Sequence, residues 1–162
     1  LVLEGVFADE HGAYPAGTYV RNPPGTAHTP RVGPEGCTIF VKLWQMQTRG
    51  ETAVTLDTAA DHPAWQPGAN AGVSVLPLYR HGEETVRMVR IEPGAVVTPH
   101  AHPGGEELLV LEGGFRDEEG HYGAGTWVRS PVGTRHAPVS DEGCLLWIKT
   151  GHLAGEIRAP VA

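Results

Sequence analysis

Residues 94–113 read GAVVTPHAHPGGEELLVLEG and place His100 and His102 one residue apart, with Glu106 four residues further on. On a strand, side chains at alternate positions point to the same face of the sheet. The three residues share parity, although a Pro-Gly-Gly turn separates the carboxylate from the histidines. Two imidazoles and a carboxylate that meet at one point suit a borderline divalent cation, so this stretch predicts a metal site on a β structure.

A fourth ligand type follows in residues 125–136, which read GTWVRSPVGTRH. This pattern predicts a strand, a Pro/Gly turn and then a histidine, His136. An isolated His-x-His on a strand is more often a feature of a protein surface than a metal site. Four ligand-type residues embedded among spaced Gly and Pro positions form a far more specific pattern.

The two stretches resemble the two sequence motifs of the cupin superfamily. The first has a glycine ahead of His-x-His, then a spaced Glu and Gly, and the second has Gly, Pro-x-Gly and His. The chain departs from the pattern at Ser140, where cupins often place an asparagine that is not a metal ligand. The resemblance implies an all-β fold, a double-stranded β-helix also called a jelly roll or cupin barrel. It also implies that His100, His102, Glu106 and His136 bind one metal ion.

The sequence also repeats itself, since LVLEG at residues 1–5 recurs at residues 109–113, an offset of 108. At this offset the two halves match at aromatic, acidic, turn and histidine positions, including His28 with His136. The repetition predicts two tandem cupin repeats. We expect residues 1–50 to form the C-terminal part of a first repeat and residues 51–162 to form a complete second repeat.

The first repeat is expected to be incomplete. Leu1 aligns with Leu109, which lies beyond the three ligands of the first motif, so the matching His-x-His and Glu would precede residue 1. The sequence is therefore interpreted as a bicupin truncated at its N-terminus, in which His28 lacks partner ligands. In an intact parent protein, His28 would belong to a first metal site.

The composition favours a small domain built from short strands over a nucleic-acid-binding or membrane protein. A chain of 162 residues with 22 glycines, 14 prolines and short apolar runs favours one domain or two small ones built from short strands. A net charge of −7 argues against non-specific nucleic-acid binding, and no membrane span or signal peptide is expected. Cys37 and Cys144 occupy equivalent places in the two repeats, so no disulfide is expected and a cytoplasmic location is the default.

Strands joined by Gly and Pro turns are expected throughout, and only residues 53–65 allow a short helical turn. A hairpin turn is expected over residues 8–12, with Gly12 at positive φ. The expected strands are residues 1–7, 18–22, 38–46, 52–57, 73–80, 85–92, 96–102, 107–116, 126–130 and 145–150.

The ligand set narrows the chemistry without choosing the metal. Three neutral imidazoles and one carboxylate suit one divalent ion per complete repeat, with zinc first and iron, manganese or nickel as alternatives. Open coordination positions would serve water, substrate or dioxygen. No catalytic residue is identified, and surface or core roles are preferred for five residues that could line the barrel: Arg90, Tyr122, Arg129, Arg135 and Trp147.

Finer features resemble the ChrR-like cupins, notably residues 100–115, the DEEGHY run at residues 117–122 and SPVGTRH at residues 130–136. These cupins are relatives of the C-terminal domain of a zinc-dependent anti-sigma factor that responds to singlet oxygen. The resemblance implies a metal-bound cupin linked to oxidative stress. Because anti-sigma activity in that family lies in a separate helical zinc domain, sigma-factor binding is not expected from this chain alone.

Two functions from different classes follow. The first is a metal-binding sensor or a module that binds a small molecule. The alternative is an iron(II)-dependent cupin dioxygenase acting on a small organic substrate, in which the protein ligands fix the metal geometry. Uncovered strand edges and apolar surface in the first repeat also lead us to expect a homodimer.

Overall fold

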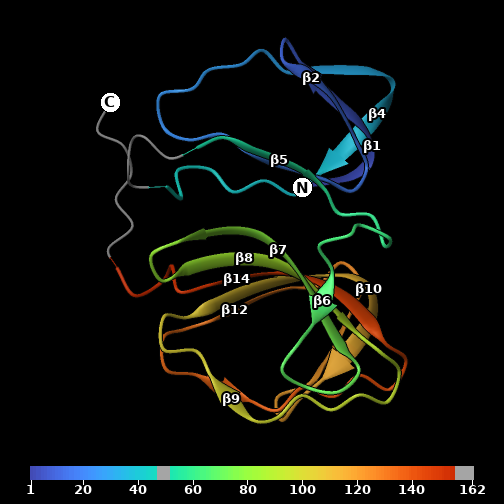
Figure 1. Ribbon diagram of the computed structural model, residues 1–162, viewed down its shortest axis with the longest axis vertical. Coiled ribbons are helices and arrows are strands. Elements are labelled where there is room, and N and C mark those ends of the chain that lie inside the picture. Colours follow the sequence, from blue (N-terminus) through green and yellow to red (C-terminus); the bar gives the residue numbers. More distant parts are fainter. Residues whose placement is uncertain (47–51, 156–162) are drawn as a thin grey trace. The chain divides into compact units, whose positions relative to one another are not determined.

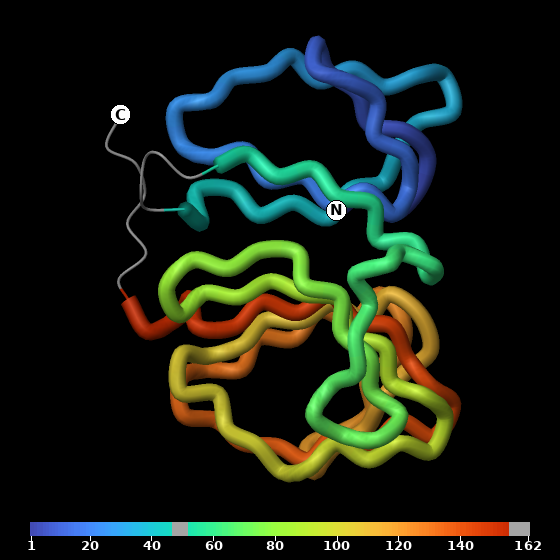
Figure 2. The backbone as a smooth tube through the Cα atoms, viewed as in Figure 1, coloured from blue at the N-terminus to red at the C-terminus, as the bar shows by residue number. Residues whose placement is uncertain are grey.

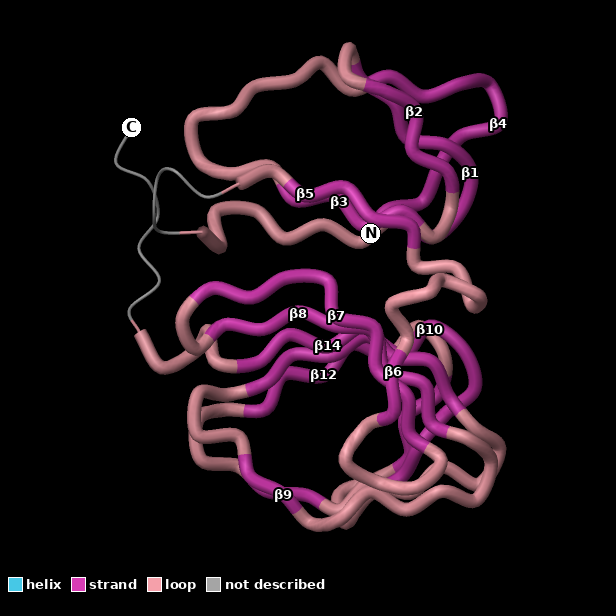
Figure 3. The backbone as a smooth tube through the Cα atoms, in the orientation of Figure 1, coloured by secondary structure: helices cyan, strands magenta, loops and turns pink. Residues whose placement is uncertain are grey.

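The computed structural model describes residues 1–46 and 52–155. Every regular element in this part of the chain is a β-strand, which confirms the expected all-β fold (Figures 1 and 3). The chain divides into two compact units, the first described over residues 1–46 and 52–62 and the second over residues 63–155. The boundary expected between residues 50 and 51 lies outside the described residues. No described segment forms a helix long and apolar enough to cross a membrane.

The first unit pairs its strands in two small antiparallel sheets. β1 lies between β2 and β4, and β3 pairs with β5. The strand expected over residues 52–57 is therefore present as β5, and its partner lies in the first unit. Figure 2 shows the backbone path of these strands as a tube. The strands are β1 (Val2–Asp9), β2 (Gly12–Pro15), β3 (Thr18–Arg21), β4 (Arg31–Ile39) and β5 (Val54–Asp57).

The β1–β2 hairpin differs from its expected form. The chain reverses at Glu10 and His11, and Gly12 is already the first residue of β2. The backbone N–H groups of His11 and Gly12 donate to Oδ1 of Asp9 over 2.8 and 3.2 Å. This aspartate turn supplies the reversal, so the expectation of positive φ at Gly12 is wrong.

The second unit is built on one large antiparallel sheet with the strand order β11-β10-β14-β8-β7-β6, in which β12 also pairs with β10. A separate pair, β9 and β13, lies on the opposite side of this unit from β7 and β8 (Figure 1). The strands are β6 (Gln66–Pro67), β7 (Val73–His81), β8 (Glu84–Ile91), β9 (His100–Ala101), β10 (Glu106–Arg116), β11 (His121–Gly123), β12 (Trp127–Ser130), β13 (Arg135–His136) and β14 (Cys144–Thr150).

The central strands of the second unit are buried on both faces. On one face, Val89, Leu108 and Ile148 belong to an apolar cluster, which we call the interior face. Met88 and Trp147, on the other face of the same strands, are also buried. Burying a side chain of this size stabilises the fold by about 1.5–3 kcal/mol. Because both faces are apolar, the sequence of these strands shows no clean alternation.

A glycine in β10, Gly113, lies opposite Cys144 where β10 pairs with β14. Gly113 has a φ of 62°, and a Cβ at this position would collide with the carbonyl oxygen of Gly143. Gly5 of β1 has a φ of 69°, and a Cβ there would collide with the carbonyl oxygen of Gly36. The close approach of the two backbones therefore requires glycine at the same point in each unit.

Two expected strands differ from the observed ones by more than two residues at an end. The strand expected over residues 38–46 is β4, which ends at Ile39 opposite Val2, where its partner strand β1 begins. The segment 96–102 is a regular strand only at His100–Ala101. Pro99 has no N–H to donate, and the N–H of Thr98 donates to the side chain of Asn70 over 3.1 Å, so the ladder is interrupted there and pairing resumes only at an isolated bridge between Val96 and Val139.

Candidate metal centre

Three imidazoles meet in the second unit. His100 on β9, His102 directly after it and His136 on β13 each offer a ligand atom, and these atoms all lie within 4.8 Å of one another. The register of β9 and β13 sets His136 opposite His100, with their Nε2 atoms 3.2 Å apart. Zinc with nitrogen ligands at about 2.0 Å in tetrahedral geometry separates those nitrogens by about 3.3 Å. The spacing therefore fits a pair that shares one metal ion.

Hydrogen bonds donated by Nδ1 fix the orientation of two of these rings. Nδ1 of His136 lies 3.1 Å from Oδ2 of Asp117, and Nδ1 of His100 lies 3.0 Å from the carbonyl oxygen of Thr98. Because a carboxylate and a carbonyl only accept hydrogen bonds, both Nδ1 atoms carry the proton. The two Nε2 lone pairs then face each other, an arrangement that a shared cation stabilises.

His102 and Glu106 complete the surroundings of the triad. The backbone N–H of His102 donates to the carbonyl of Thr134 over 2.9 Å, which links the first motif to the turn before His136. The carboxylate of Glu106 lies 3.5 Å from Nδ1 of His102 and 3.9 Å from Nε2 of His136. Nε2 of His102 and Oε1 of Glu106 are buried and have no hydrogen-bond partner. Since an unsatisfied buried polar atom is costly, these two atoms also fit a bound metal ion.

Burial keeps two rings of the triad, His100 and His102, in the form that binds metal. It lowers the pKa of His102 to about 4, with the charges of His136, His100 and Arg87 as further causes. Burial also lowers the pKa of His100, against the hydrogen bond to Thr98, which raises it. Both rings are therefore neutral near pH 7, and a neutral imidazole is the ligand form. Burial raises the pKa of Glu106, and a cation beside it would favour the charged carboxylate.

Asp117 supports the site, and sequence reasoning did not assign it this role. Burial acts to raise the pKa of Asp117, but the N–H of Glu119, the ring of His136 and the N–H of Gly120 hold that pKa below its usual value. The charged carboxylate is thus available to accept the Nδ1 proton of His136. The signal that could have found it is the repeat, which matches Asp117 with Asp9.

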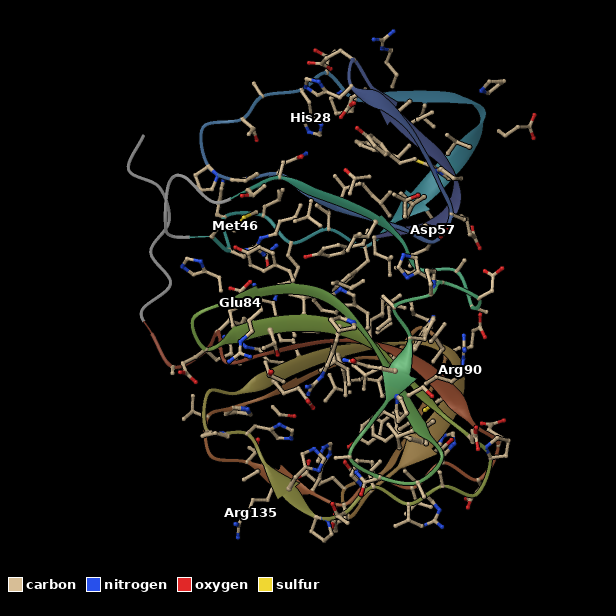
Figure 4. The ribbon with its side chains drawn as sticks, viewed as in Figure 1. His28, Met46, Asp57, Glu84, Arg90 and Arg135 are labelled. Carbon is tan, nitrogen blue, oxygen red and sulfur yellow. The ribbon has the colours of Figure 1, made fainter. Side chains whose placement is uncertain are left out.

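The first unit contains the counterpart of this half of the site. Nδ1 of His28 lies 3.1 Å from Oδ2 of Asp9, the same distance as in the His136–Asp117 pair. Figure 4 labels His28 on the segment between β3 and β4. In the part of the chain that the structure describes, His28 belongs to no cluster of three ligand-type residues.

The five residues that could have lined the barrel have other environments. Arg135 is exposed and points outward from β13 (Figure 4). The Arg90 guanidinium lies 4.5 Å from the ring centroid of Trp65, and Tyr122 stacks on Phe115 at 4.9 Å. Nε of Arg129 lies 3.7 Å from Oε1 of Glu107, and Trp147 is buried on the face of β14 away from the interior face.

Comparison with known proteins identifies a family. The family model described as the ChrR cupin-like domain matches residues 1–47 and 52–154. The anti-sigma-E factor ChrR of Cereibacter sphaeroides is 40% identical over 62 residues, which cover 38% of this chain and 29% of that protein. The match therefore spans less than a third of the curated relative's length.

Solved structures agree with this assignment. The structure of Rhodobacter sphaeroides SigE in complex with the anti-sigma factor ChrR matches with a TM-score of 0.51 and 33% identity, over 57% of this chain and 51% of that one. An acetylacetone dioxygenase from Acinetobacter johnsonii matches with a TM-score of 0.56 and 14% identity, over 64% of this chain and 78% of that one. At that identity the second likeness concerns the fold alone.

Proposed function

The chain belongs to the ChrR cupin-like domain family, and from this premise we propose that its second unit is a metal-binding cupin module that senses or binds a small molecule. The observation that carries the proposal is the meeting of three imidazoles, two of them with Nε2 atoms 3.2 Å apart. A shared cation makes that contact favourable when both Nδ1 atoms hold the protons, because both Nε2 atoms then offer lone pairs.

We assign four ligands, His100, His102, Glu106 and His136. Glu106 joins the triad because its buried Oε1 has no hydrogen-bond partner and faces Nε2 of His136 over 3.9 Å. When bound, a divalent ion supplies a Lewis-acidic position at which an oxygen or nitrogen of a small molecule can coordinate. Asp117 holds the His136 ring, and Thr98 holds the His100 ring.

We propose that the chain holds two tandem cupin repeats, residues 1–50 and 51–162, with the first repeat contributing only its second motif. Contacts that recur at the offset of 108 support this. The N–H of Gly17 donates to the carbonyl of Val2 over 2.9 Å, and the N–H of Gly125 donates to the carbonyl of Val110 over 2.8 Å. The hydroxyl groups of Thr26 and Thr134 each donate over 2.8 Å to a proline carbonyl three residues earlier.

The partner named for the relative is a sigma factor, and we do not extend that partner to this chain. The match covers 29% of the Cereibacter protein, and the proposal concerns the metal centre within the matched family domain. A sensing role would consist of a change at the metal centre that alters the packing of β9 and β13.

The second candidate function is a metal-dependent dioxygenase with iron(II) in the same site. It is favoured by the partial exposure of His100, which leaves one side of the triad within reach of a substrate. Four protein ligands also leave coordination positions free on an ion that prefers six ligands. Here the residues position the ion and the substrate, and none acts as an acid or base.

Metal analysis separates these functions. Protein purified without added metal is analysed by mass spectrometry for zinc, iron, manganese and nickel, and oxygen uptake is then followed with a panel of diketones and catechols. Zinc near one equivalent with no oxygen uptake supports the sensor or binding module, whereas iron with turnover supports the dioxygenase. A protein that takes up none of these ions when they are supplied refutes the metal centre.

A further inference from the structure

We propose that Arg87 forms, beside the metal centre, a subsite for the carboxylate of a small organic anion. The proposal rests on the proposed function, because the anion would lie between the metal ion and the guanidinium. Arg87 is not among the residues that the sequence pattern suggested for this unit. Its position on β8 and the state of its side chain carry the inference.

Register places Arg87 on the interior face of the sheet. Val89 and Ile91, two and four residues further along β8, belong to the interior apolar cluster. Side chains two residues apart on a strand share a face, so Arg87 points the same way. Its direct partner across β14 is Ile148, which is opposite Leu108 of β10, and both belong to the same cluster.

Polar side chains occupy the end of the interior face where Arg87 lies. One row across the three central strands consists of Thr85, Thr150 and Glu106. The two threonine hydroxyls are 2.8 Å apart. Glu106 is the proposed metal ligand, and Arg87 is in the next row that faces inward, two residues beyond Thr85. The interior face is thus apolar along most of its length and polar only beside the metal centre.

The guanidinium of Arg87 has unused hydrogen-bonding capacity. Its Nε is buried and has no hydrogen-bond partner, and within the described part of the chain the side chain makes no ion pair. Its charge nevertheless reaches the site, because it contributes, after burial and the neighbouring imidazoles, to the lowered pKa of His102. A buried guanidinium donor without a partner is costly unless a ligand satisfies it.

The charge balance favours an anion. A divalent ion and Arg87 together carry three positive charges, whereas the two carboxylates of the site, Glu106 and Asp117, carry two negative charges. Glu107 lies on the opposite face of β10 and pairs with His152 over 2.9 Å, so it does not neutralise the interior. One net positive charge beside the proposed metal centre attracts a monoanion.

The planar fork of a guanidinium selects the chemical class. It binds a carboxylate through two parallel N–H donors, which a neutral amide of the same shape cannot match because it offers only one oxygen. A small carboxylate therefore satisfies the donors of Arg87 while its charge offsets the cation.

The test compares propionate with propionamide on the zinc-loaded full chain at pH 7, by saturation-transfer NMR titration, with zinc content measured in every sample. We expect propionate to bind in the millimolar range and propionamide to bind at least tenfold more weakly. Arg87→Gln should weaken propionate binding at least tenfold with zinc content unchanged. Arg90→Gln is the matched control, because Arg90 is on the same strand but stacks on Trp65, and it should bind propionate as the wild type does.

Each outcome of this experiment supports or overturns the proposed subsite. Wild-type protein that takes up no zinc overturns the metal centre and this subsite together, whereas wild-type protein that binds zinc but not propionate overturns the subsite alone. Unchanged binding by Arg87→Gln, or loss of zinc in it, also overturns the subsite. If Arg87→Gln fails to fold, Arg87→Lys keeps the charge without the fork and should bind propionate about fivefold more weakly; binding within about twofold of wild type contradicts the proposal.

Discussion

His28 and His136 have nearly the same local surroundings, yet only His136 faces other imidazoles. Each ring is oriented by an aspartate 3.1 Å from its Nδ1, and each follows a Pro-x-Gly turn. His136 meets His100 and His102 across β9 and β13, whereas His28 joins no such cluster in the described residues. The second motif therefore orients one histidine, and a triad that could hold a metal ion forms only where the first motif supplies the other two.

The largest expected difference between the two units is in metal affinity. His136→Ala removes one of four ligands, and structural zinc sites of about 10–16 kcal/mol lose roughly 4 kcal/mol per ligand, or about a thousandfold in affinity. His28→Ala should leave zinc affinity unchanged. Competition with a chromophoric chelator measures both variants. Equal losses in the two variants would contradict the assignment of the metal to the second unit.

Replacing the two glycines at which backbones approach closely should lower stability by similar amounts in the two units. Gly113→Ala forces a Cβ into the carbonyl oxygen of Gly143 at positive φ, and Gly5→Ala does the same against Gly36. We expect each substitution to lower the free energy of unfolding by about 3 kcal/mol, measured by urea denaturation. Gly120→Ala, with no atom near the added Cβ, is the control. A stable Gly5→Ala variant would contradict the proposed equivalence of β1 and β10.

Replacing the orienting aspartates should also affect zinc affinity in the second unit only, by less than the loss of His136. Asp117→Asn keeps the oxygen that accepts from Glu119 and Gly120 but removes the negative charge beside His136. Loss of such an outer partner lowers metal affinity by about 10- to 100-fold. Asp9→Asn, the matched change beside His28, should not alter zinc affinity in the same chelator competition. Loss of zinc in Asp9→Asn alone would refute the comparison.

The smallest effect is expected at the two cysteines. Burial raises the pKa of the Cys144 thiol, with the charge of Glu142 adding to it and a hydrogen bond from Ser140 opposing it. A raised pKa leaves less thiolate at pH 8, so Cys144 should react with iodoacetamide about tenfold more slowly than the half-buried Cys37. Mass spectrometry of timed digests reads out both sites. Faster modification of Cys144 would contradict its burial.

Sequence reasoning was most successful where local spacing and chain geometry agree. The His-x-His spacing of His100 and His102 on a strand predicted that both rings would face one point, and the family resemblance was confirmed. Sequence reasoning failed where a side chain, rather than the backbone alone, determines the local conformation through a hydrogen bond to a backbone N–H. Asp9 forms the β1–β2 turn, so Gly12 has no need of positive φ. Thr98 donates to Asn70 before Pro99, so the strand at His100 is short.

The sequence by itself determined the all-β fold, the repeat and the presence of a possible metal-binding triad, because these follow from residue types at fixed spacing. Only the tertiary structure decided which partners surround that triad. Asp117, in the turn between β10 and β11, lies 3.1 Å from Nδ1 of His136, and Arg87 lies on the interior face with Val89 and Ile91 of β8. When both faces of a strand are apolar, periodicity cannot tell which one is the interior, and strand register alone settles it.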